Sequence, residues 1–178
     1  GVAVYRAWQS LNAPPPMMMA GHSLGEYTAL VASGALKFAD ALPLVRYRAD
    51  CMQLAVPEGV GGIAAILGLE DEVVREVCQE GAQNEGLEAV NYNSPGQIVI
   101  AGNRAAVERG MELAKARGAK RALMLPMSVP SHCSLLKGAA EKLRTYLENI
   151  AMQAPAVPVL HNADVKSYAD ADSIKDAL

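Results

Sequence analysis

The feature that most constrains this chain is a short glycine-flanked turn, G-H-S-L-G at residues 21–25, where the sequence pattern changes. Before it, residues 17–20 form a continuous apolar run that predicts a buried strand. After it, apolar residues recur at helical spacing over 24–33, and Gly34 is placed to end that helix. G-x-S-x-G at a strand-to-helix turn is typical of a nucleophile elbow, in which the glycines allow a tight turn around an exposed serine. The pattern predicts an α/β fold with Ser23 as a candidate nucleophile.

The helix expected to begin at Leu24 adds an electrostatic argument. Its first backbone N–H groups and the positive end of its dipole point at the turn. The Leu24 N–H is therefore placed to stabilise an oxyanion formed when Ser23 attacks a carbonyl carbon. A purely structural alternative is a tight turn in which Ser23 caps the helix. The motif alone leaves both interpretations open.

A serine nucleophile needs a base, and the sequence holds three histidines. His22 adjoins Ser23 around a sharp turn, so the two side chains point in different directions. His132 follows Pro130 and Ser131. His161 follows the apolar run 157–160 and lies near Asp164. Each of the last two is either the base or a solvated or capping histidine.

The middle of the chain has a regular order of elements. We expect strands and helices in the order strand 63–69, helix 70–81, strand 87–93, strand 97–101, helix 103–117 and strand 120–125. This β-α-β-β-α-β order is typical of a ferredoxin-like domain, and a plain α/β layer with a hairpin is the alternative. We predict one α/β domain, formed by residues 1–57 and 131–178, interrupted by a small domain at 58–130.

The rest of the chain is expected to hold helices at 2–10, 39–54 and 135–150, a short strand at 157–161 and a polar tail. The helix at 39–54 carries Arg46 and Arg48. An arginine on its inner side would be costly unless it met an anion. The spacing does not decide which of the two faces inward, and a solvated surface position is the alternative for either.

Two further groups of polar residues are candidates for binding. Asn91 and Asn93 flank Tyr92, so both amides are expected on one face of a strand, and a hydrogen-bonded strand end is the alternative. Four basic residues surround Gly118: Lys115, Arg117, Lys120 and Arg121. Such a cluster is either a solvated surface or a docking site for an acidic partner protein.

Composition excludes several function classes. The net charge is −3 and aromatic residues make up 4%, which argues against binding to nucleic acid or to an anionic membrane. The three cysteines form no C-x-x-C pair, so neither a disulfide framework nor a zinc site is indicated. Reduced thiols in the cytoplasm are the simplest interpretation.

Four segments together closely resemble the bacterial malonyl-CoA:acyl-carrier-protein transacylases of fatty acid biosynthesis. The segments are GHSLGEYTALVASGAL, LVRYRADCMQ, AVNYNSPGQIVIAG and LPMSVPSHCSLLK. The resemblance implies an α/β-hydrolase-like large domain with an inserted ferredoxin-like small domain. It implies ping-pong transfer of malonyl from malonyl-CoA to the phosphopantetheine thiol of acyl carrier protein. It implies no metal or nucleotide cofactor, and a monomeric parent enzyme in the cytoplasm.

The resemblance also implies roles for individual residues. Ser23 matches the nucleophile, His132 the base, and Arg48 the residue that pairs with the free malonyl carboxylate. The Leu24 N–H matches half of the oxyanion hole. Asn91, Asn93 and Met52 would line the substrate pocket. Lys120 and Arg121 would meet the carrier protein.

We expect the chain to be a fragment, because the family has a G-Q-G-S-Q loop before the elbow and further elements after the region matched here. Two other functions stay open at this point. One is a serine hydrolase or thioesterase that uses Ser23, a histidine and Asp164. Asp164 follows both candidate histidines, whereas the acid of α/β-hydrolases usually precedes the histidine. The other is a non-catalytic domain that binds carrier protein.

Overall fold

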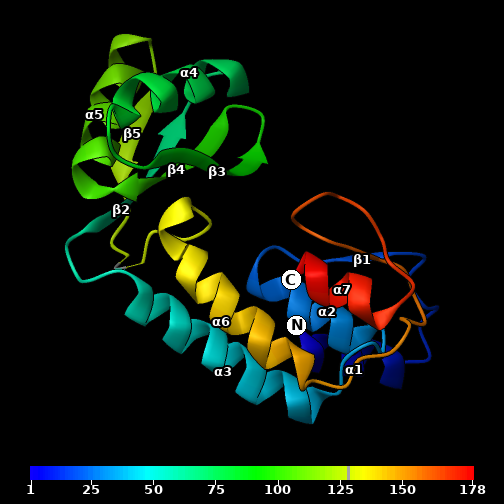
Figure 1. Cartoon of the computed structure of the whole chain (residues 1–178). Coiled ribbons are helices and arrows are strands. Elements are labelled where there is room, and N and C mark those ends of the chain that lie inside the picture. Colours follow the sequence, from blue (N-terminus) through cyan, green and yellow to red (C-terminus); the bar gives the residue numbers. More distant parts are fainter. Residues whose placement is uncertain (128) are drawn as a thin grey trace. The chain divides into compact units, whose positions relative to one another are not determined.

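The computed structural model describes residues 1–127 and 129–178. It is a mixed α/β fold with a four-stranded antiparallel sheet and a parallel pair of strands. The chain forms two compact units, Gly1–Ala49 with Lys142–Leu178, and Asp50–Glu141 (Figure 1). The boundaries expected at 58 and 130 from the sequence stay a prediction.

The second unit contains the expected β-α-β-β-α-β order. Its elements are β2 Gly61–Leu67, α4 Asp71–Ala82, β3 Leu87–Ser94, β4 Gln97–Asn103, α5 Arg104–Ala116 and β5 Arg121–Met124. The strands pair in the order β3-β4-β2-β5, and every neighbouring pair is antiparallel. The predicted order of elements is confirmed, with bounds that differ by a few residues.

Alternation along β2 divides the core of this unit between two faces of the sheet. Ala64 and Ile66 pack with residues of α4 and α5, including Val74 and Val107, and all four are 1% exposed or less. Both helices therefore lie on one side of the sheet (Figure 1). Ile63 points to the opposite face of the sheet. There it packs in a second cluster with Val99, Ala101 and Cys133. This opposite face anchors the segment that carries His132.

The first unit contains α1 Val2–Ser10, β1 Met19–Ala20, α2 Leu24–Ala32, β6 Val159–Leu160 and α7 Ala171–Ala177. Two helices, α3 Phe38–Ala55 and α6 Lys137–Glu148, each have residues in both units, and a 3-10 turn, η1 Ser134–Leu136, precedes α6. The core of the first unit is formed by fully buried aliphatic side chains such as Leu30, Leu36, Leu44 and Ile174. The expected helices are confirmed, and Gly34 has the positive φ of +80° expected after the end of α2.

The two short strands are smaller than the sequence predicts. Strands β1 and β6 pair in parallel over two residues each, with Ala20 opposite Leu160. Met17 is 94% exposed, so a buried strand over 17–20 is wrong at its start. The Met19 N–H donates to the Pro158 carbonyl at 2.8 Å, but Pro158 has no N–H with which to extend the ladder toward Met17.

The expected polar tail is also wrong, because it contains helix α7. Asp170 caps this helix by accepting a hydrogen bond from the Ser173 N–H at 2.8 Å. Ile174 then lies fully buried in the core of the first unit. Only one of the seven residues of α7 is a large apolar residue, and this is too weak a periodic signal to predict the helix from spacing alone.

Within residues 1–127 and 129–178, no helix has both the length and the hydropathy that crossing a membrane requires. The same residues contain no group of three or more His, Cys, Asp or Glu side chains that could hold a metal ion. The three cysteines are free thiols, and each is buried.

We predict that Cys78 resists thiol reagents in the folded protein. Burial raises the pKa of its thiol to about 12, compared with about 9 for an ordinary thiol. At pH 8 the reactive thiolate fraction is then about 1,000-fold smaller than usual. Labelling with Ellman's reagent, located by peptide mass spectrometry, should modify Cys78 only after unfolding in urea. Rapid stoichiometric labelling of Cys78 in the native protein would contradict the buried position.

Candidate active site

The elbow after β1 is as tight as the motif predicts. Ser23 has φ 51° and ψ −110°, and a positive φ is uncommon outside glycine. A Cβ on Gly21 would lie 2.0 Å from both the carbonyl carbon and the carbonyl oxygen of Gly25. Any side chain at position 21 would therefore collide with backbone. The turn that presents Ser23 depends on glycine at this position.

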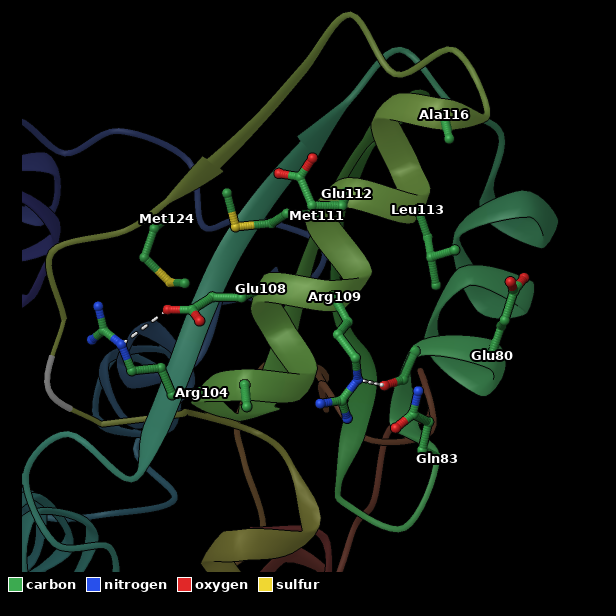
Figure 2. Close-up of a pocket in the computed structure, with 12 residues that line it drawn as sticks. Glu80, Gln83, Arg104, Glu108, Arg109, Met111, Glu112, Leu113, Ala116 and Met124 are labelled. Carbon is green, nitrogen blue, oxygen red and sulfur yellow. Dashed lines mark hydrogen bonds and ion pairs between the residues drawn. The ribbon is translucent and has the colours of Figure 1, made fainter.

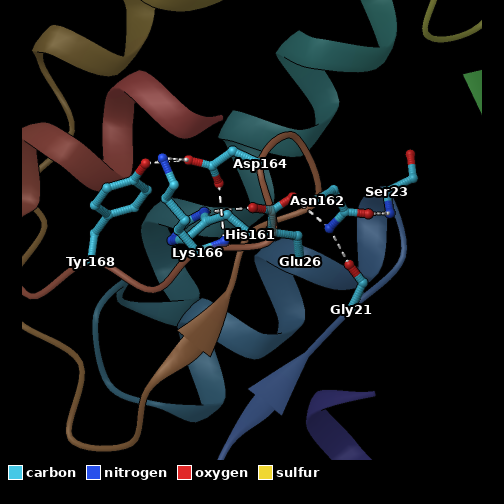
Figure 3. A network of polar contacts seen from close by, with 8 residues as sticks. All are labelled: Gly21, Ser23, Glu26, His161, Asn162, Asp164, Lys166 and Tyr168. Carbon is cyan, nitrogen blue, oxygen red and sulfur yellow. Dashed lines mark hydrogen bonds and ion pairs between the residues drawn. The ribbon is translucent and has the colours of Figure 1, made fainter.

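The side chain of Asn162 spans this turn (Figure 3). Its Oδ1 accepts a hydrogen bond from the Ser23 N–H at 3.0 Å, and its Nδ2 donates to the Gly21 carbonyl at 2.6 Å. Asn162 lies just beyond the end of β6, and Ser23 lies just beyond the end of β1. Because β1 and β6 are parallel, their carboxyl ends meet at the same edge, which brings residues 139 apart in sequence together.

A buried acid–base pair lies behind the turn. Glu26 is 5% exposed and His161 is 2% exposed. His161 Nδ1 lies 2.6 Å from Glu26 Oε1, an ion-pair distance without the alignment of a regular hydrogen bond. Glu26 Oε2 accepts a hydrogen bond from Asn162 Nδ2 at 2.8 Å. Burial raises the pKa of Glu26, and this effect outweighs the opposing effects of His161 and Asn162.

Arg48 is the arginine of α3 that faces the elbow. It is half-buried, whereas Arg46 is exposed. Its Nη2 donates a hydrogen bond to Ser23 Oγ at 3.2 Å, and its guanidinium carbon lies 5.7 Å from the centre of the Tyr27 ring. The structure therefore answers the question that the spacing left open, and it places a fixed cation beside the candidate nucleophile.

The backbone N–H of Leu24 is available at the start of α2. The neighbouring N–H groups of Ser23, Gly25 and Glu26 bond to Asn162 Oδ1, the His22 carbonyl and the Ser23 carbonyl. Among the residues that the structure describes, no acceptor is recorded for the Leu24 N–H. A first-turn N–H without a partner, directly after the serine, is the donor that an oxyanion site needs.

His132 belongs to the second unit and has a strained backbone of its own, with φ 65°. The segment that carries it is anchored on both sides. A Cβ on Gly61 would lie 2.5 Å from Pro130 Cγ, so the proline ring rests directly on β2. Beyond His132, the Ser134 N–H donates to Glu88 Oε1 at 3.0 Å. The side chain of His132 is exposed, and its pairing with Ser23 stays a prediction.

The hydrolase alternative finds little support in the geometry around Asp164. His161 contacts Glu26 through Nδ1 and is almost fully buried. Asp164 accepts hydrogen bonds from the Tyr168 hydroxyl and, at 3.2 Å, from the Lys166 N–H. Both groups have structural partners, and neither has a recorded hydrogen bond to Ser23 within the described parts of the chain.

The residues predicted to line a pocket lie in the second unit. Asn91 is half-buried and pairs with Val99 across the sheet. Asn93 is exposed and lies where the register shifts between Tyr92 and Ser94, so the regular alternation predicted for this strand is interrupted there. Met52 is half-buried near the end of α3. The proposed contact of these three residues with substrate stays a prediction.

The basic cluster separates into two parts. Arg117 forms ion pairs with Glu76 at 2.7 Å and with Glu80 at 2.6 Å, and Lys115 pairs with Glu112 at 2.8 Å. Arg117 therefore links the end of α5 to α4, and Lys115 stabilises α5 itself. Lys120 and Arg121 are exposed at the start of β5, and no ion pair is recorded for either within the described residues.

A cavity of about 960 Å³ lies on the second unit, and its lining includes none of the predicted site residues (Figure 2). It is lined mainly by residues of α4 and α5. Arg104 pairs with Glu108 at 3.2 Å, and Arg109 donates to the Gly81 carbonyl at 3.0 Å. With its charges engaged in structural contacts and no nucleophile in its lining, this cavity offers no evident chemistry.

Glu26 and Asn162 contribute to the contacts around the elbow, and the sequence analysis did not single out either residue. Glu26 lies in the first turn of α2. Acidic residues are stabilised there by the positive end of the helix dipole, so a glutamate at this position does not by itself indicate a functional role. Asn162 directly follows a short apolar run. One sequence signal could have pointed to Asn162. If the apolar runs 17–20 and 157–160 pair in parallel, the residues that follow them lie at the same edge of the sheet.

The acyl transferase domain family matches residues 1–174 of this chain. The malonyl CoA-acyl carrier protein transacylase of Escherichia coli (strain K12) is 55% identical over 177 residues, which are 99% of this chain and 57% of that protein. The corresponding protein of Haemophilus influenzae is 52% identical. The chain therefore spans little more than half the length of the curated relatives it matches.

Solved structures give the same result. An acyl-carrier-protein S-malonyltransferase from Burkholderia pseudomallei is 57% identical with a TM-score of 0.97, covering 99% of this chain and 57% of that one. A malonyl-transacylase solved in complex with its type II polyketide synthase acyl-carrier protein is 50% identical, with a TM-score of 0.97 and the same coverage.

We predict that Gly21→Ala strongly destabilises the protein. The new Cβ would overlap the Gly25 backbone, which has no flexible end that can move aside. The loss in the free energy of unfolding should be on the order of 3 kcal/mol or more. The matched control is Gly25→Ala, because a Cβ there would meet no atom within 4 Å beyond its chain neighbours and the nearby backbone of its own helix. Alanine in a helix is favoured over glycine by about 0.5–1 kcal/mol. Urea unfolding of the two variants measures the difference, and similar stabilities would refute the argument.

Proposed function

This chain belongs to the acyl transferase domain family, and we propose that it carries the nucleophile and the acyl-selecting arginine of a malonyl-CoA:acyl-carrier-protein transacylase. The observation that carries the proposal is the hydrogen bond of 3.2 Å from Arg48 to Ser23 Oγ at a nucleophile elbow. The similarity to malonyl transacylases over 99% of the chain supports it.

We also propose the finer domain organisation. The first unit is part of an α/β-hydrolase-like domain, 1–57 and 131–178, and residues 58–130 are an inserted ferredoxin-like domain. The strand order β3-β4-β2-β5 with two helices on one face supports the second assignment. The elbow between β1 and α2 supports the first.

In the proposed reaction, Ser23 Oγ attacks the thioester carbonyl of malonyl-CoA. The hydroxyl proton passes to His132 as the C–O bond forms, and the oxyanion is stabilised by the Leu24 N–H. The C–S bond then breaks, and His132 returns the proton to the departing thiolate of coenzyme A. The phosphopantetheine thiol of acyl carrier protein reverses these steps, which releases Ser23 and completes a ping-pong cycle.

Arg48 would select the acyl group. The free carboxylate of a malonyl group lies two carbon atoms beyond the carbonyl that is attacked, so it needs a cation close to the nucleophile. Arg48 already contacts Ser23 Oγ, and its planar guanidinium is suited to holding a carboxylate through two hydrogen bonds. An acetyl group has no such carboxylate and gains nothing from this contact.

The remaining residues would serve binding. Asn91, Asn93 and Met52 would line the acyl pocket, and the cations Lys120 and Arg121 would meet the acidic carrier protein. The exposure of both cations supports the last role. So does the solved complex of a 50% identical malonyl-transacylase with its carrier protein. We place the protein in the cytoplasm as a monomer.

We expect that malonyl-CoA acylates Ser23. Intact mass spectrometry of the full-length protein that contains this chain, after brief exposure to malonyl-CoA, should reveal one malonyl adduct. The adduct should be absent from Ser23→Ala. Rapid release of free malonate without carrier protein would favour the hydrolase instead. Binding of carrier protein with no adduct at all would favour a non-catalytic domain.

We predict that Arg48→Ala greatly weakens the preference for malonyl over acetyl. The preference should fall roughly 10- to 150-fold, as expected for the loss of a hydrogen-bonded charge pair worth about 1.5–3 kcal/mol. The measurement is the ratio of kcat/KM for malonyl-CoA and acetyl-CoA. Arg46→Ala removes an exposed arginine from the same helix and is the control. An unchanged ratio in Arg48→Ala would exclude Arg48 as the selecting residue.

A further inference from the structure

We propose that Asn162 is a positioning residue for Ser23, and that buried Glu26 holds its side-chain amide in the one orientation that can perform this role. The proposal rests on the proposed function for its biological meaning. Its physical basis is the set of contacts around the elbow (Figure 3).

The amide of Asn162 is fully engaged. Its two N–H groups donate to the Gly21 carbonyl and to Glu26 Oε2, and its Oδ1 accepts from the Ser23 N–H. Rotating the amide by half a turn would place Oδ1 against a carbonyl oxygen and a carboxylate oxygen, and it would leave the Ser23 N–H facing another donor. The three contacts therefore define a single orientation.

The contacts with Gly21 and Ser23 join the residues on both sides of His22. The Asn162 side chain thus bonds to the Gly21 carbonyl before the turn and to the Ser23 N–H after it. Ser23 has a positive φ of 51°, which persists only where the surroundings leave no relaxed alternative. Holding the Ser23 N–H fixes the backbone from which the side chain projects, and Arg48 contacts Oγ itself at 3.2 Å.

Glu26 is itself held in place. It lies in the first turn of α2, almost fully buried, with His161 Nδ1 at 2.6 Å from its other oxygen. The His161 ring lies against Tyr168, with 5.5 Å between ring centres. The titratable groups around the amide are thus Glu26 from α2 and His161 from the segment after β6, while Arg48 from α3 reaches Ser23. This rigid support gives the amide its orientation.

The test is Asn162→Asp in the full-length protein. When ionised, the introduced carboxylate would oppose the Glu26 carboxylate and the Gly21 carbonyl, and both donors of the amide would be lost. We expect kcat for acylation by malonyl-CoA at pH 8 to fall roughly 10- to 100-fold, with KM changed little. As the pH falls, protonation of the introduced carboxylate restores one O–H donor, so the rate relative to wild type should rise. Asn149→Asp, at an exposed helix end, should match wild type at every pH.

A second variant and a second probe keep the result interpretable. Asn162→Ser removes the contacts without adding charge, so its rate should be low but should show no recovery relative to wild type as the pH falls. A fluorophosphonate probe that reacts with activated serines measures Ser23 without malonyl-CoA. If wild type reacts with the probe but not with malonyl-CoA, the proposed function fails while the probe rates still test Asn162.

The outcomes separate positioning from general stability. Folded variants, verified by thermal unfolding, that react with both reagents at wild-type rates would overturn the proposal. So would a loss expressed only in KM, or a failure of both Asn162 variants to fold while Asn149→Asp folds. Folded variants with reduced probe rates, and recovery at low pH for Asn162→Asp alone, are the result we expect.

Discussion

The absence of a side chain at Gly21 is the constraint on which the elbow depends. Helix α2 turns back so closely on the end of β1 that a Cβ at this position would lie 2.0 Å from the Gly25 carbonyl. This approach brings the first N–H groups of α2 directly beside Ser23 and obliges Ser23 to adopt φ 51°. A non-glycine residue in such a conformation costs of order 1–3 kcal/mol, which the surrounding contacts must offset.

Those contacts come from a distant part of the chain. Asn162 bonds on both sides of the turn, and its amide is oriented by Glu26, which in turn lies against His161. A buried acid–base pair is a poor device for stability alone, since removing charges from water costs about as much as their attraction returns. The pair is better understood as a support that gives one amide one orientation.

The sequence predicted the second unit well and the site only in part. The strands and helices from β2 to β5 have clear periodicity and glycine or proline boundaries, so their order follows from local patterns. Strands β1 and β6 have only two residues each, and their extent depends on Pro158, which has no N–H. The link from Glu26 to Asn162 joins residues 136 apart, and no local pattern encodes that contact. Likewise, spacing along α3 could not separate Arg46 from Arg48, because only the position of Ser23 distinguishes them.

Ser23 and His132 share an unusual property, since both are non-glycine residues with positive φ. Each is held by its own unit: Ser23 by Gly21 and Asn162, and His132 by the packing of Pro130 on Gly61 and by the Ser134–Glu88 hydrogen bond. Strain that persists must be maintained by neighbours, and here the two sets of neighbours have no residue in common. A substitution that loosens one set should therefore relax one of these two backbones and leave the other unchanged. The protein thus fixes the proposed nucleophile and the proposed base through independent contacts, which allows the position of each to be altered separately.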